Sequence, residues 1–352
     1  KSDTTKLFPA LTNGTKYYFR VKAVDHVWNI SEYSSEISVT PTHNTKIYVA
    51  RDGNDSGSYG LESSPFLTID AALTYAKDND TIYVNAGTYN ETLLTWDHTN
   101  LLFKSVAGAN STVIDAQNKT LNVINITGSG TIDGFTITNS NASNSGVIDL
   151  VADFQGNPVK IINCRLINNL GQDGVIKSKN GKIEIVDSYF SGNGSKTTSW
   201  GVITASSSYG VKITNCTFEN NNTHTSTIVI VSWQNNAYCE IVNSKFINET
   251  KDANRSSIHI RDSGIPAVIK ISGCLFYNGS GMQIDSGDNG GDLLVSNTRF
   301  SRNTHNRDSG YTLLRTRKAE FNSCVFDSNR IEETGLIKSH GTNTTDSLVI
   351  TN

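Results

Sequence analysis

The sequence of 352 residues has no apolar run approaching the roughly 18 residues that a membrane-spanning helix needs. Charged residues make up only 18% of the chain and the formal net charge is -3, so there is no general attraction for nucleic acid. Methionine occurs once and proline five times. These absences exclude a membrane span within this segment, and they require any charge-based binding to come from a local patch.

The abundant residues are small and polar. There are 28 glycines, and asparagine, serine and threonine are frequent throughout the chain. This profile is typical of a β-rich, turn-rich extracellular protein, so we expect an extracellular or cell-surface location. The chain begins inside a recognisable domain, so the lack of a signal peptide does not argue against export.

Metal sites and disulfides have little support in the sequence. Five cysteines cannot all pair with one another, and no CxxC or Cys/His cluster suggests zinc. We therefore expect no cofactor. A Ca²⁺ site would depend on one of two sparse acidic groups. These groups are Asp285, Asp288 and Asp292, and Asp52, Asn54 and Asp55.

Asn-x-Ser/Thr triplets recur along the chain. They would be glycosylation sites if the source organism modifies them, and in a chain this rich in Asn and Thr many arise by chance. The candidate asparagines are Asn13, Asn90, Asn118, Asn125, Asn193, Asn215 and Asn278.

Residues 1–42 predict two strands, 16–24 and 34–40. The spacing of Leu11, Asn13, Tyr17 and the alternating residues after it resembles the last third of a fibronectin type III domain, in which Tyr17 would be the tyrosine-corner residue. Two strands cannot form a sandwich core, so the resemblance implies only the C-terminal strands of such a domain. The alternative is a β-hairpin packed on the next domain.

Residues 43–117 form a second unit. Thr68 is a suitable N-cap for an amphipathic helix over 69–77. The segment from Pro65 through this helix, followed by the motifs at 80–84 and 87–91, resembles the N-terminal cap of pectate-lyase-like right-handed β-helix proteins. A short α-helix there would cover the apolar end of the β-helix core and the unpaired strand edges at that end.

Residues 118–352 are a repeat whose period, measured from Phe135 to Cys324, averages about 27 residues. This interval, combined with strand-type alternation, suits one turn of a parallel β-helix. The predicted fold is therefore all-β: a right-handed parallel β-helix with an N-terminal helix cap and a partial fibronectin type III sandwich. The last segment, 348–352, begins a further turn, so we expect the helix to be truncated at its C-terminal end.

Three columns of the repeat predict structure rather than binding. One column holds residues that tolerate a left-handed bend, and we expect its side chains to hydrogen-bond along the stack. A second is an aromatic core stack. In the third, cysteines alternate with Ser or Thr, so the cysteines lie two turns apart, beyond disulfide reach, which indicates buried thiols. The three columns are Asn163, Asp187, Asn215, Asn243, Gly273 and Asn297; Phe190, Phe218, Phe246, Phe276, Phe300 and Phe326; and Cys164, Ser188, Cys216, Ser244, Cys274, Thr298 and Cys324.

A second strand in each turn carries the candidate binding face. In the last four turns this strand carries mostly basic residues. Like charges on neighbouring strands are unfavourable by a few tenths to about 1 kcal/mol, so a sheet without a binding role would not be expected to place them together. The basic face therefore suggests a groove for an anionic polysaccharide. The alternative is a solvated edge relieved by nearby acids and counterions. The alignment that produces this face pairs His259 with Gln283, and Arg261 with Asp285. The candidate residues are His259, Arg261, Asp285, Arg315, Arg317, Lys338 and His340.

Two functions of different classes follow. One is a structural or adhesive protein that binds a polysaccharide, a cell-surface glycan or copies of itself. The other, implied by the β-helix resemblance, is a secreted polysaccharide lyase or a related carbohydrate-active enzyme acting on uronate-containing polymers. In a lyase, Arg315, Arg317, Lys338 and His259 could act on the substrate, with Asp285 orienting. The paired aspartates of the pectin hydrolases are absent, and the fold alone does not establish catalysis.

Overall fold

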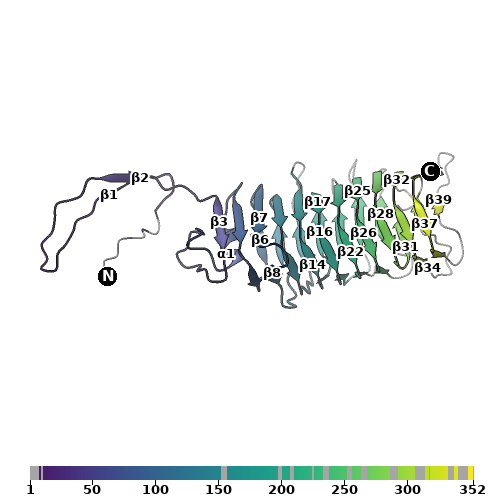
Figure 1. Cartoon of the computed structure of the whole chain (residues 1–352), viewed down its shortest axis with the longest axis horizontal. Helices are drawn as coiled ribbons and strands as arrows, with labels where there is room; N and C mark the ends of the chain where they lie inside the picture. Colours follow the sequence, from purple (N-terminus) through teal and green to yellow (C-terminus); the bar gives the residue numbers. More distant parts are fainter. Residues whose placement is uncertain are drawn as a thin grey trace.

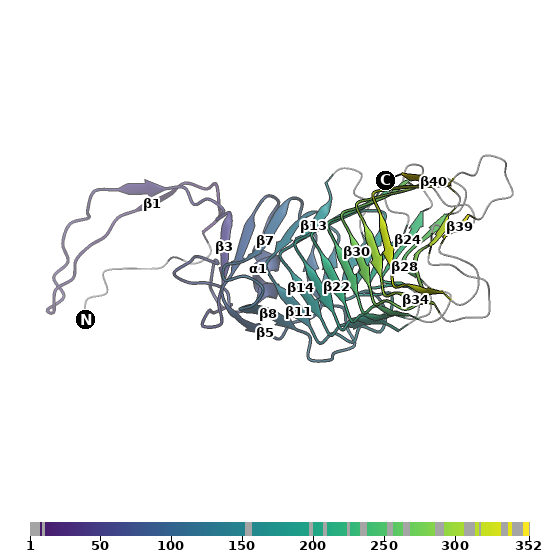
Figure 2. The same cartoon turned by 45° about the vertical axis from the view of Figure 1, so that its right-hand side comes forward.

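The computed structural model describes residue 8 and residues 11–151, 157–196, 200–206, 210–223, 226–232, 238–251, 256–262, 268–285, 292–305, 314–316, 318–331, 337–339 and 348–351. Three long sheets of parallel strands run side by side along one axis (Figures 1 and 2). From Thr81 to Ser339 the chain passes through all three sheets in each turn before it starts the next. The result is a right-handed parallel β-helix, as the repeat predicts.

The first sheet has twelve strands. Its order follows the chain, and adjacent members come from successive turns. Its strands are β3 Lys46–Val49, β4 Thr81–Val84, β7 Leu101–Ser105, β10 Gly130–Asp133, β13 Val159–Ile162, β17 Lys182–Val186, β21 Gly210–Thr214, β25 Tyr238–Val242, β29 Val268–Ser272, β32 Asp292–Ser296, β36 Lys318–Asn322 and β40 Leu348–Thr351.

The second sheet has ten short strands, each one sharp bend beyond the first sheet. Its strands are β5 Gly87–Tyr89, β8 Thr112–Asp115, β11 Thr136–Thr138, β14 Arg165–Ile167, β18 Tyr189–Ser191, β22 Thr217–Glu219, β26 Lys245–Ile247, β30 Leu275–Tyr277, β33 Arg299–Ser301 and β37 Val325–Asp327.

The third sheet also has ten strands and completes each turn. Its strands are β6 Leu94–Trp96, β9 Ile124–Ile126, β12 Ile148–Leu150, β16 Ile176–Lys179, β20 Ile203–Ser206, β24 Ile228–Ser232, β28 Ser256–Asp262, β31 Met282–Asp285, β35 Leu314–Thr316 and β39 Ile337–Ser339. Two minor parallel sheets lie between the second and third strands of a turn. They contain β15 Leu170–Gly171, β19 Gly194–Ser195, β23 Asn222–Thr223 and β27 Thr250–Lys251, and β34 Thr304–His305 with β38 Arg330–Ile331.

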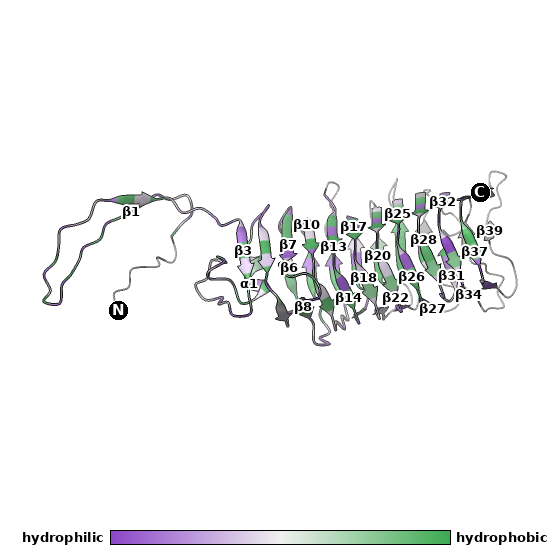
Figure 3. Cartoon of the chain, in the orientation of Figure 1, coloured by the Kyte–Doolittle hydropathy of each residue, from purple (hydrophilic) through white to green (hydrophobic). Residues whose placement is uncertain are grey.

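The core is a narrow apolar interior enclosed by the three sheets. Inward and outward residues alternate along each strand, and hydropathy changes along single strands in Figure 3. The predicted aromatic stack is confirmed: adjacent rings from Phe190 to Phe326 lie 4.7–5.0 Å apart between centroids and within 14° of parallel. Such pairs add about 0.5–1.5 kcal/mol beyond the burial of their surface.

The predicted bends between the first and second sheets are confirmed as left-handed. Asn163, Asp187 and Asn215 have φ angles of 54°, 49° and 55°. A left-handed residue reverses the alternation, so two consecutive strands both keep an apolar face toward the core. Some bend side chains bond along the stack, as from Asn215 Nδ2 to Asp187 Oδ1 at 3.1 Å.

A second ladder, which the sequence pattern did not reveal, is fully buried. Asn169, Asn193 and Asn221 follow the bend after the second sheet, and each is 1% exposed. The side-chain oxygens of Asn193 and Asn221 accept the backbone N–H one turn earlier in the chain, as Asn193 Oδ1 does from Asn169 N at 3.0 Å. Each amide nitrogen donates to a second-sheet carbonyl, as Asn193 Nδ2 does to Leu166 O at 2.8 Å. Glu249 takes the next position and accepts from both nitrogens of Asn221.

The five cysteines are free thiols, as predicted. Cys164, Cys216, Cys239 and Cys274 are buried and Cys324 is half-buried. Burial raises the pKa of the Cys216 thiol to about 12. Ser188 alternates with these cysteines in the same column, and its Oγ donates to Val186 O at 2.8 Å.

The predicted helix is confirmed as α1, Ile69–Tyr75, two residues shorter than expected at its C-terminus. The side chain of Thr68 caps it by accepting from Ala71 N at 3.2 Å, and Glu91 accepts the N–H groups of Ile69 and Asp70. The helix contacts β3, β4 and β6, which belong to the first turns. Its role as a cap of the solenoid stays a prediction.

The N-terminal segment contains one antiparallel pair, β1 Tyr17–Phe19 and β2 Ile37–Val39. The Tyr17 hydroxyl accepts the N–H of Thr12 at 2.8 Å, which is the type of contact a tyrosine corner makes. The rest of a fibronectin-like sandwich is not seen among the described residues, so that resemblance stays a prediction.

Candidate functional site

The predicted basic face lies on the third sheet, but most of its side chains lie outside the described part of the chain. Arg317 and His340 are not among the described residues, and of Arg261, Arg315 and Lys338 only the backbone is described. The backbone register places Arg315 between Asp285 and Lys338 on successive strands. His259 and Asp285 are the two members whose side chains are described.

The predicted register between β28 and β31 is wrong by two residues. The structure pairs His259 with Asp285, whereas the sequence alignment pairs His259 with Gln283 and Arg261 with Asp285. A slip of two residues preserves the inward and outward alternation of a strand, so hydrophobic patterning cannot detect it. Asp285 therefore lies within the column of His259, Arg315 and Lys338.

His259 and Asp285 form a largely buried pair. The His259 Nδ1 atom lies 3.1 Å from Asp285 Oδ2, and the side chains are 12% and 2% exposed. A carboxylate at this nitrogen fixes the orientation of an imidazole, and it stabilises the ring when it is protonated. The pair has the arrangement of an oriented base, and it also neutralises part of the basic column.

Two other predicted sites contain residues with structural roles in the fold. Asn193 is the buried ladder residue described above, so in the folded chain it has no free amide for a glycan. Asn13, Asn90, Asn118, Asn215 and Asn278 are exposed and Asn125 is partly buried, and these remain candidate glycosylation sites. In the second Ca²⁺ candidate, the Asp55 carboxylate accepts from Leu67 N, Thr68 N and Thr68 Oγ1. No group of three or more potential metal ligands occurs among the described residues.

The structure also shows a surface that the sequence pattern did not single out. The outer face of the first sheet carries a column of alternating charges at the centre of its strands. Lys160 pairs with Glu184 at 3.2 Å, and Lys212 pairs with Glu240 at 3.2 Å. Glu240 also raises the pKa of Lys212. The next position in the column is Lys270.

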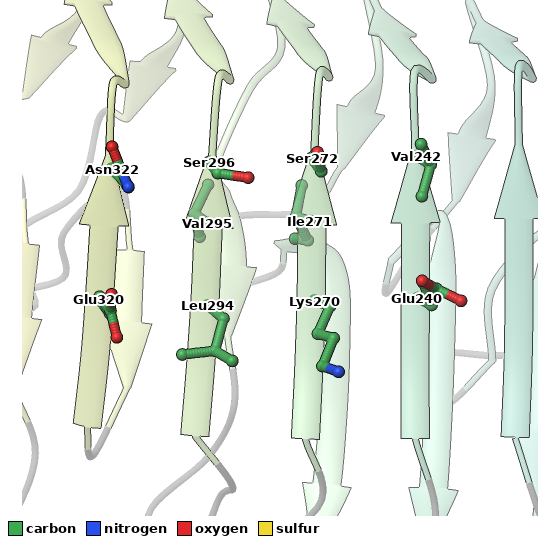
Figure 4. A pocket seen from close by; sticks show the side chains of 10 residues that line it. All are labelled: Glu240, Val242, Lys270, Ile271, Ser272, Leu294, Val295, Ser296, Glu320 and Asn322. Atoms are coloured by element: carbon green, nitrogen blue, oxygen red, sulfur yellow. The ribbon is translucent and has the colours of Figure 1, made fainter.

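Leu294 interrupts this alternation. It lies between Lys270 and Glu320 in register, where a further acid would have continued the ladder. Lys270 and Glu320 are exposed, and neither forms an ion pair within the described part of the chain. Figure 4 shows the row Glu240, Lys270, Leu294 and Glu320 across four strands, beside a second row of Val242, Ser272, Ser296 and Asn322.

These two rows line an open hollow of about 340 Å³, at the lower end of the range for ligand pockets. A smaller hollow of about 180 Å³ shares Glu240 and Lys270 with it and extends to Tyr238. The Tyr238 ring lies over Gly210, where an added Cβ would come within 2.3 Å of the ring. We call the combined surface, from Tyr238 through Lys270 to Glu320, the outer groove.

The outer groove has binding chemistry but not the usual spacing for hydrolysis. Its two lining carboxylates, Glu240 and Glu320, lie three strands apart, which is about 14 Å at the usual strand spacing. Paired carboxylates of glycosidases lie about 5–9.5 Å apart. An aromatic ring, an apolar floor, an ammonium group, a carboxylate and several hydroxyl or amide groups remain available to a ligand.

A signal for the outer groove was present in the sequence. Lys160, Glu184, Lys212, Glu240 and Lys270 each stand two residues before the last residue of a first-sheet strand, with alternating sign. Aligning these strands would have revealed Leu294 as the break in the pattern. The aromatic end of the groove could not be found in this way, because it depends on the Tyr238 ring crossing to a neighbouring strand.

One family model matches part of this chain. It is described as "Right handed beta helix region" and covers residues 200–352, which is less than half of the chain. It agrees with the fold seen over those residues. No curated protein matches the chain.

Three similar solved structures are carbohydrate-active proteins. The native GH136 lacto-N-biosidase from Eubacterium ramulus is 10% identical, with a TM-score of 0.41, 84% of this chain covered and 68% of that chain. The mannuronan C-5 epimerase A-module from Azotobacter vinelandii is 15% identical, with a TM-score of 0.29 and coverage of 77% and 93%. The family 28 exopolygalacturonase from Yersinia enterocolitica is 14% identical, with a TM-score of 0.25 and coverage of 94% and 85%. At these scores they carry no argument about what this chain binds.

Among the described residues, no helix is long and apolar enough to cross a membrane.

Proposed function

We propose that this chain is a polysaccharide-binding β-helix protein that holds a sugar chain along the outer groove. The observation that carries the proposal is the break in the charge ladder at Leu294. Because Leu294 stands where the acid of a third pair would be, Lys270 and Glu320 remain available to a ligand on either side of an apolar residue. Sugars combine apolar ring faces with hydroxyl groups that donate and accept, and this combination matches the groove.

The shape of the surface supports a chain-like ligand. The groove crosses β25, β29, β32 and β36, so its contacts repeat at about 4.8 Å along the solenoid axis. The Tyr238 ring at one end provides a flat aromatic surface. Leu294 contributes apolar contact, while Lys270 and Asn322 can donate to sugar oxygens and Glu320 can accept from hydroxyls.

The class of polysaccharide and the biological role belong to the same proposal. A basic column that includes Arg315 and Lys338 on the third sheet favours an anionic polymer, with Arg261, Arg317 and His340 as further contributors. A stiff solenoid suits an extracellular or cell-surface protein with a structural or adhesive role. Its partners would be surface glycans or copies of the chain itself.

A secreted polysaccharide lyase is the second candidate. It is favoured by the His259–Asp285 pair, in which Asp285 orients His259 as a potential base and lies next to Arg315 in register on its other side. A lyase acting on uronates needs a base for the C5 proton and a positive group that neutralises the carboxylate. His259 and Arg315 would take these two roles.

The binding proposal is tested by retention of the protein on immobilised alginate, pectate, chondroitin sulfate and dextran at low salt. We expect retention on at least one polymer, with the apparent affinity reduced about tenfold in the double variant Lys270→Ala, Glu320→Ala. The matched control is Lys160→Ala, Glu184→Ala, which removes one ammonium and one carboxylate from the same face outside the groove. No retention on any polymer, or equal retention of the two double variants, would contradict the proposal.

The third-sheet column is tested separately with Arg315→Ala plus Arg317→Ala on immobilised polyuronate. Loss of retention in this variant supports an anionic ligand on the basic column, and unchanged retention removes that column from the proposal. The lyase candidate is tested by incubation with alginate, pectate and chondroitin while the absorbance of unsaturated uronate is monitored. A flat trace with all three substrates removes catalysis of this type and leaves the binding proposal standing.

A further inference from the structure

A second hollow lies on the outer face of the second sheet, near the C-terminal end of the described part of the β-helix. It has a volume of about 370 Å³ and is lined by residues of β30, β33 and β37 and of the bends that follow two of them. Its charged members are Arg299, Arg302 and Asp327. Neither the predicted basic column nor the outer groove includes any of these residues.

The two arginines of this hollow have different partners. Arg299 forms a bidentate pair with Asp327, with Nε–Oδ1 and Nη2–Oδ2 distances of 2.9 and 3.0 Å. This pairing lowers the pKa of Asp327. Arg302 donates from Nη1 to the Tyr277 hydroxyl at 3.1 Å, and its guanidinium carbon lies 5.8 Å from the centre of the Tyr277 ring. Within the described residues Arg302 has no ion-pair partner, so the hollow retains one net positive charge.

Arg302 also stands at an unusual backbone position. Its φ angle is 54°, in the left-handed region that disfavours most side chains. The equivalent bends in earlier turns hold Asn or Gly, as at Gly192, Asn248 and Asn278. Asn is the residue that this left-handed backbone favours, so backbone preference does not account for an arginine at position 302. Departures from a local structural rule of this kind are characteristic of functional positions.

We propose that this hollow binds a uronic acid residue, with the sugar carboxylate on Arg302. A guanidinium group presents paired donors that match the geometry of a carboxylate. Leu275 and the Tyr277 ring supply apolar contact for the sugar ring. The hollow is small enough to select a single sugar unit or a short end of a chain rather than a long segment.

Asp327 explains why the ligand is a sugar acid rather than a simple carboxylate. Its oxygens accept three hydrogen bonds, two from Arg299 and one from Ser301 Oγ at 3.0 Å. A carboxylate has about four acceptor positions, so one remains for a ligand hydroxyl. A simple carboxylate ligand has no hydroxyl group to donate to Asp327. A uronate can place its carboxylate on Arg302 and also donate from a hydroxyl group to Asp327.

The site is tested by ligand-observed NMR with D-glucuronate and D-galacturonate, compared with D-glucose and D-galactose. We expect saturable binding of at least one uronate and at least tenfold weaker binding of its uncharged counterpart. Arg302→Asn should weaken uronate binding about ten- to one-hundred-fold, since a charged hydrogen-bonding group is lost. The same variant should unfold at an equal or higher urea concentration, because Asn suits the left-handed bend.

Two control variants show whether uronate binding depends on this hollow. Arg165→Asn removes an arginine that lies over Tyr189 on the same sheet, and we expect no change in uronate binding. Lys160→Ala, Glu184→Ala, which lines neither hollow, should also retain uronate binding. Because Arg302 is not part of the outer groove, the hollow can fail or succeed independently of the proposed polysaccharide groove. The proposal is overturned if the wild type does not bind uronates saturably, if sugars and sugar acids bind equally, or if Arg302→Asn binds like the wild type.

Discussion

The buried asparagine ladder provides the sharpest test of what stabilises this solenoid. Asn193 is 1% exposed, and its side chain accepts from Asn169 N and donates to Leu166 O. It also accepts from Asn169 Nδ2 at 3.3 Å and donates to Asn221 Oδ1 at 3.0 Å. Asn193→Ala would remove all four hydrogen bonds while keeping a backbone conformation that alanine tolerates.

The expected loss follows from the groups left behind. The N–H of Asn169 would be buried without an acceptor, which costs about 1–3 kcal/mol, and each of the other lost bonds contributes about 0.5–1.5 kcal/mol. Bonds within one network do not add in full, so the free energy of unfolding should fall by about 2–5 kcal/mol. The effect should be larger than that of a typical single substitution.

The measurement is urea unfolding followed by far-UV circular dichroism, with the slope of the transition compared between variants. The matched control is Asn85→Ala, which removes an exposed asparagine just after β4 and should change stability by less than about 0.5 kcal/mol. A loss below about 1 kcal/mol for Asn193→Ala, or a loss equal to that of the control, would refute the idea that the ladder stabilises the fold.

Three further predictions concern the core, the thiols and the groove. Phe246→Ala should lower the free energy of unfolding by about 3–5 kcal/mol in the same urea assay, because the ring is buried between two stacked rings; a loss under about 1 kcal/mol would contradict the packing. In the native protein at pH 8, an aromatic disulfide reagent should modify Cys324 first, because burial raises the pKa of Cys216 to about 12 and leaves it almost wholly protonated there; all five should react in denaturant, and equal native rates would count against the assignment. Gly210→Ala should displace the Tyr238 ring and reduce stability by about 1–3 kcal/mol, since the new Cβ would meet that ring at 2.3 Å; unchanged tyrosine absorbance and stability would show that the ring does not lie there.

Much of the fold could be predicted because each turn repeats the same local rules. The Phe246 column was readable from its spacing alone, and the bends at Asn163 and Asn215 were marked by a residue type that tolerates left-handed backbone. The buried Asn193 ladder was missed because its residues follow directly after a bend and resemble a loop. Only the closed solenoid makes that position an interior one.

The candidate sites were harder to predict, because each combines residues from different turns. The pairing of His259 with Asp285 depends on a register that alternation leaves open by two residues. The outer groove depends on Leu294 lying between Lys270 and Glu320 across three strands. The hollow near Arg302 depends on a guanidinium group reaching back to Tyr277 in the preceding turn.

The sequence by itself determined the period of the solenoid, its apolar interior, the left-handed bends and the unpaired cysteines, because alternation and backbone preference act over a few residues. The tertiary structure decided which outward side chains became neighbours. Those side chains lie about 24–30 residues apart in the sequence but only about 4.8 Å apart in adjacent strands, and the lateral register between turns sets which of them meet.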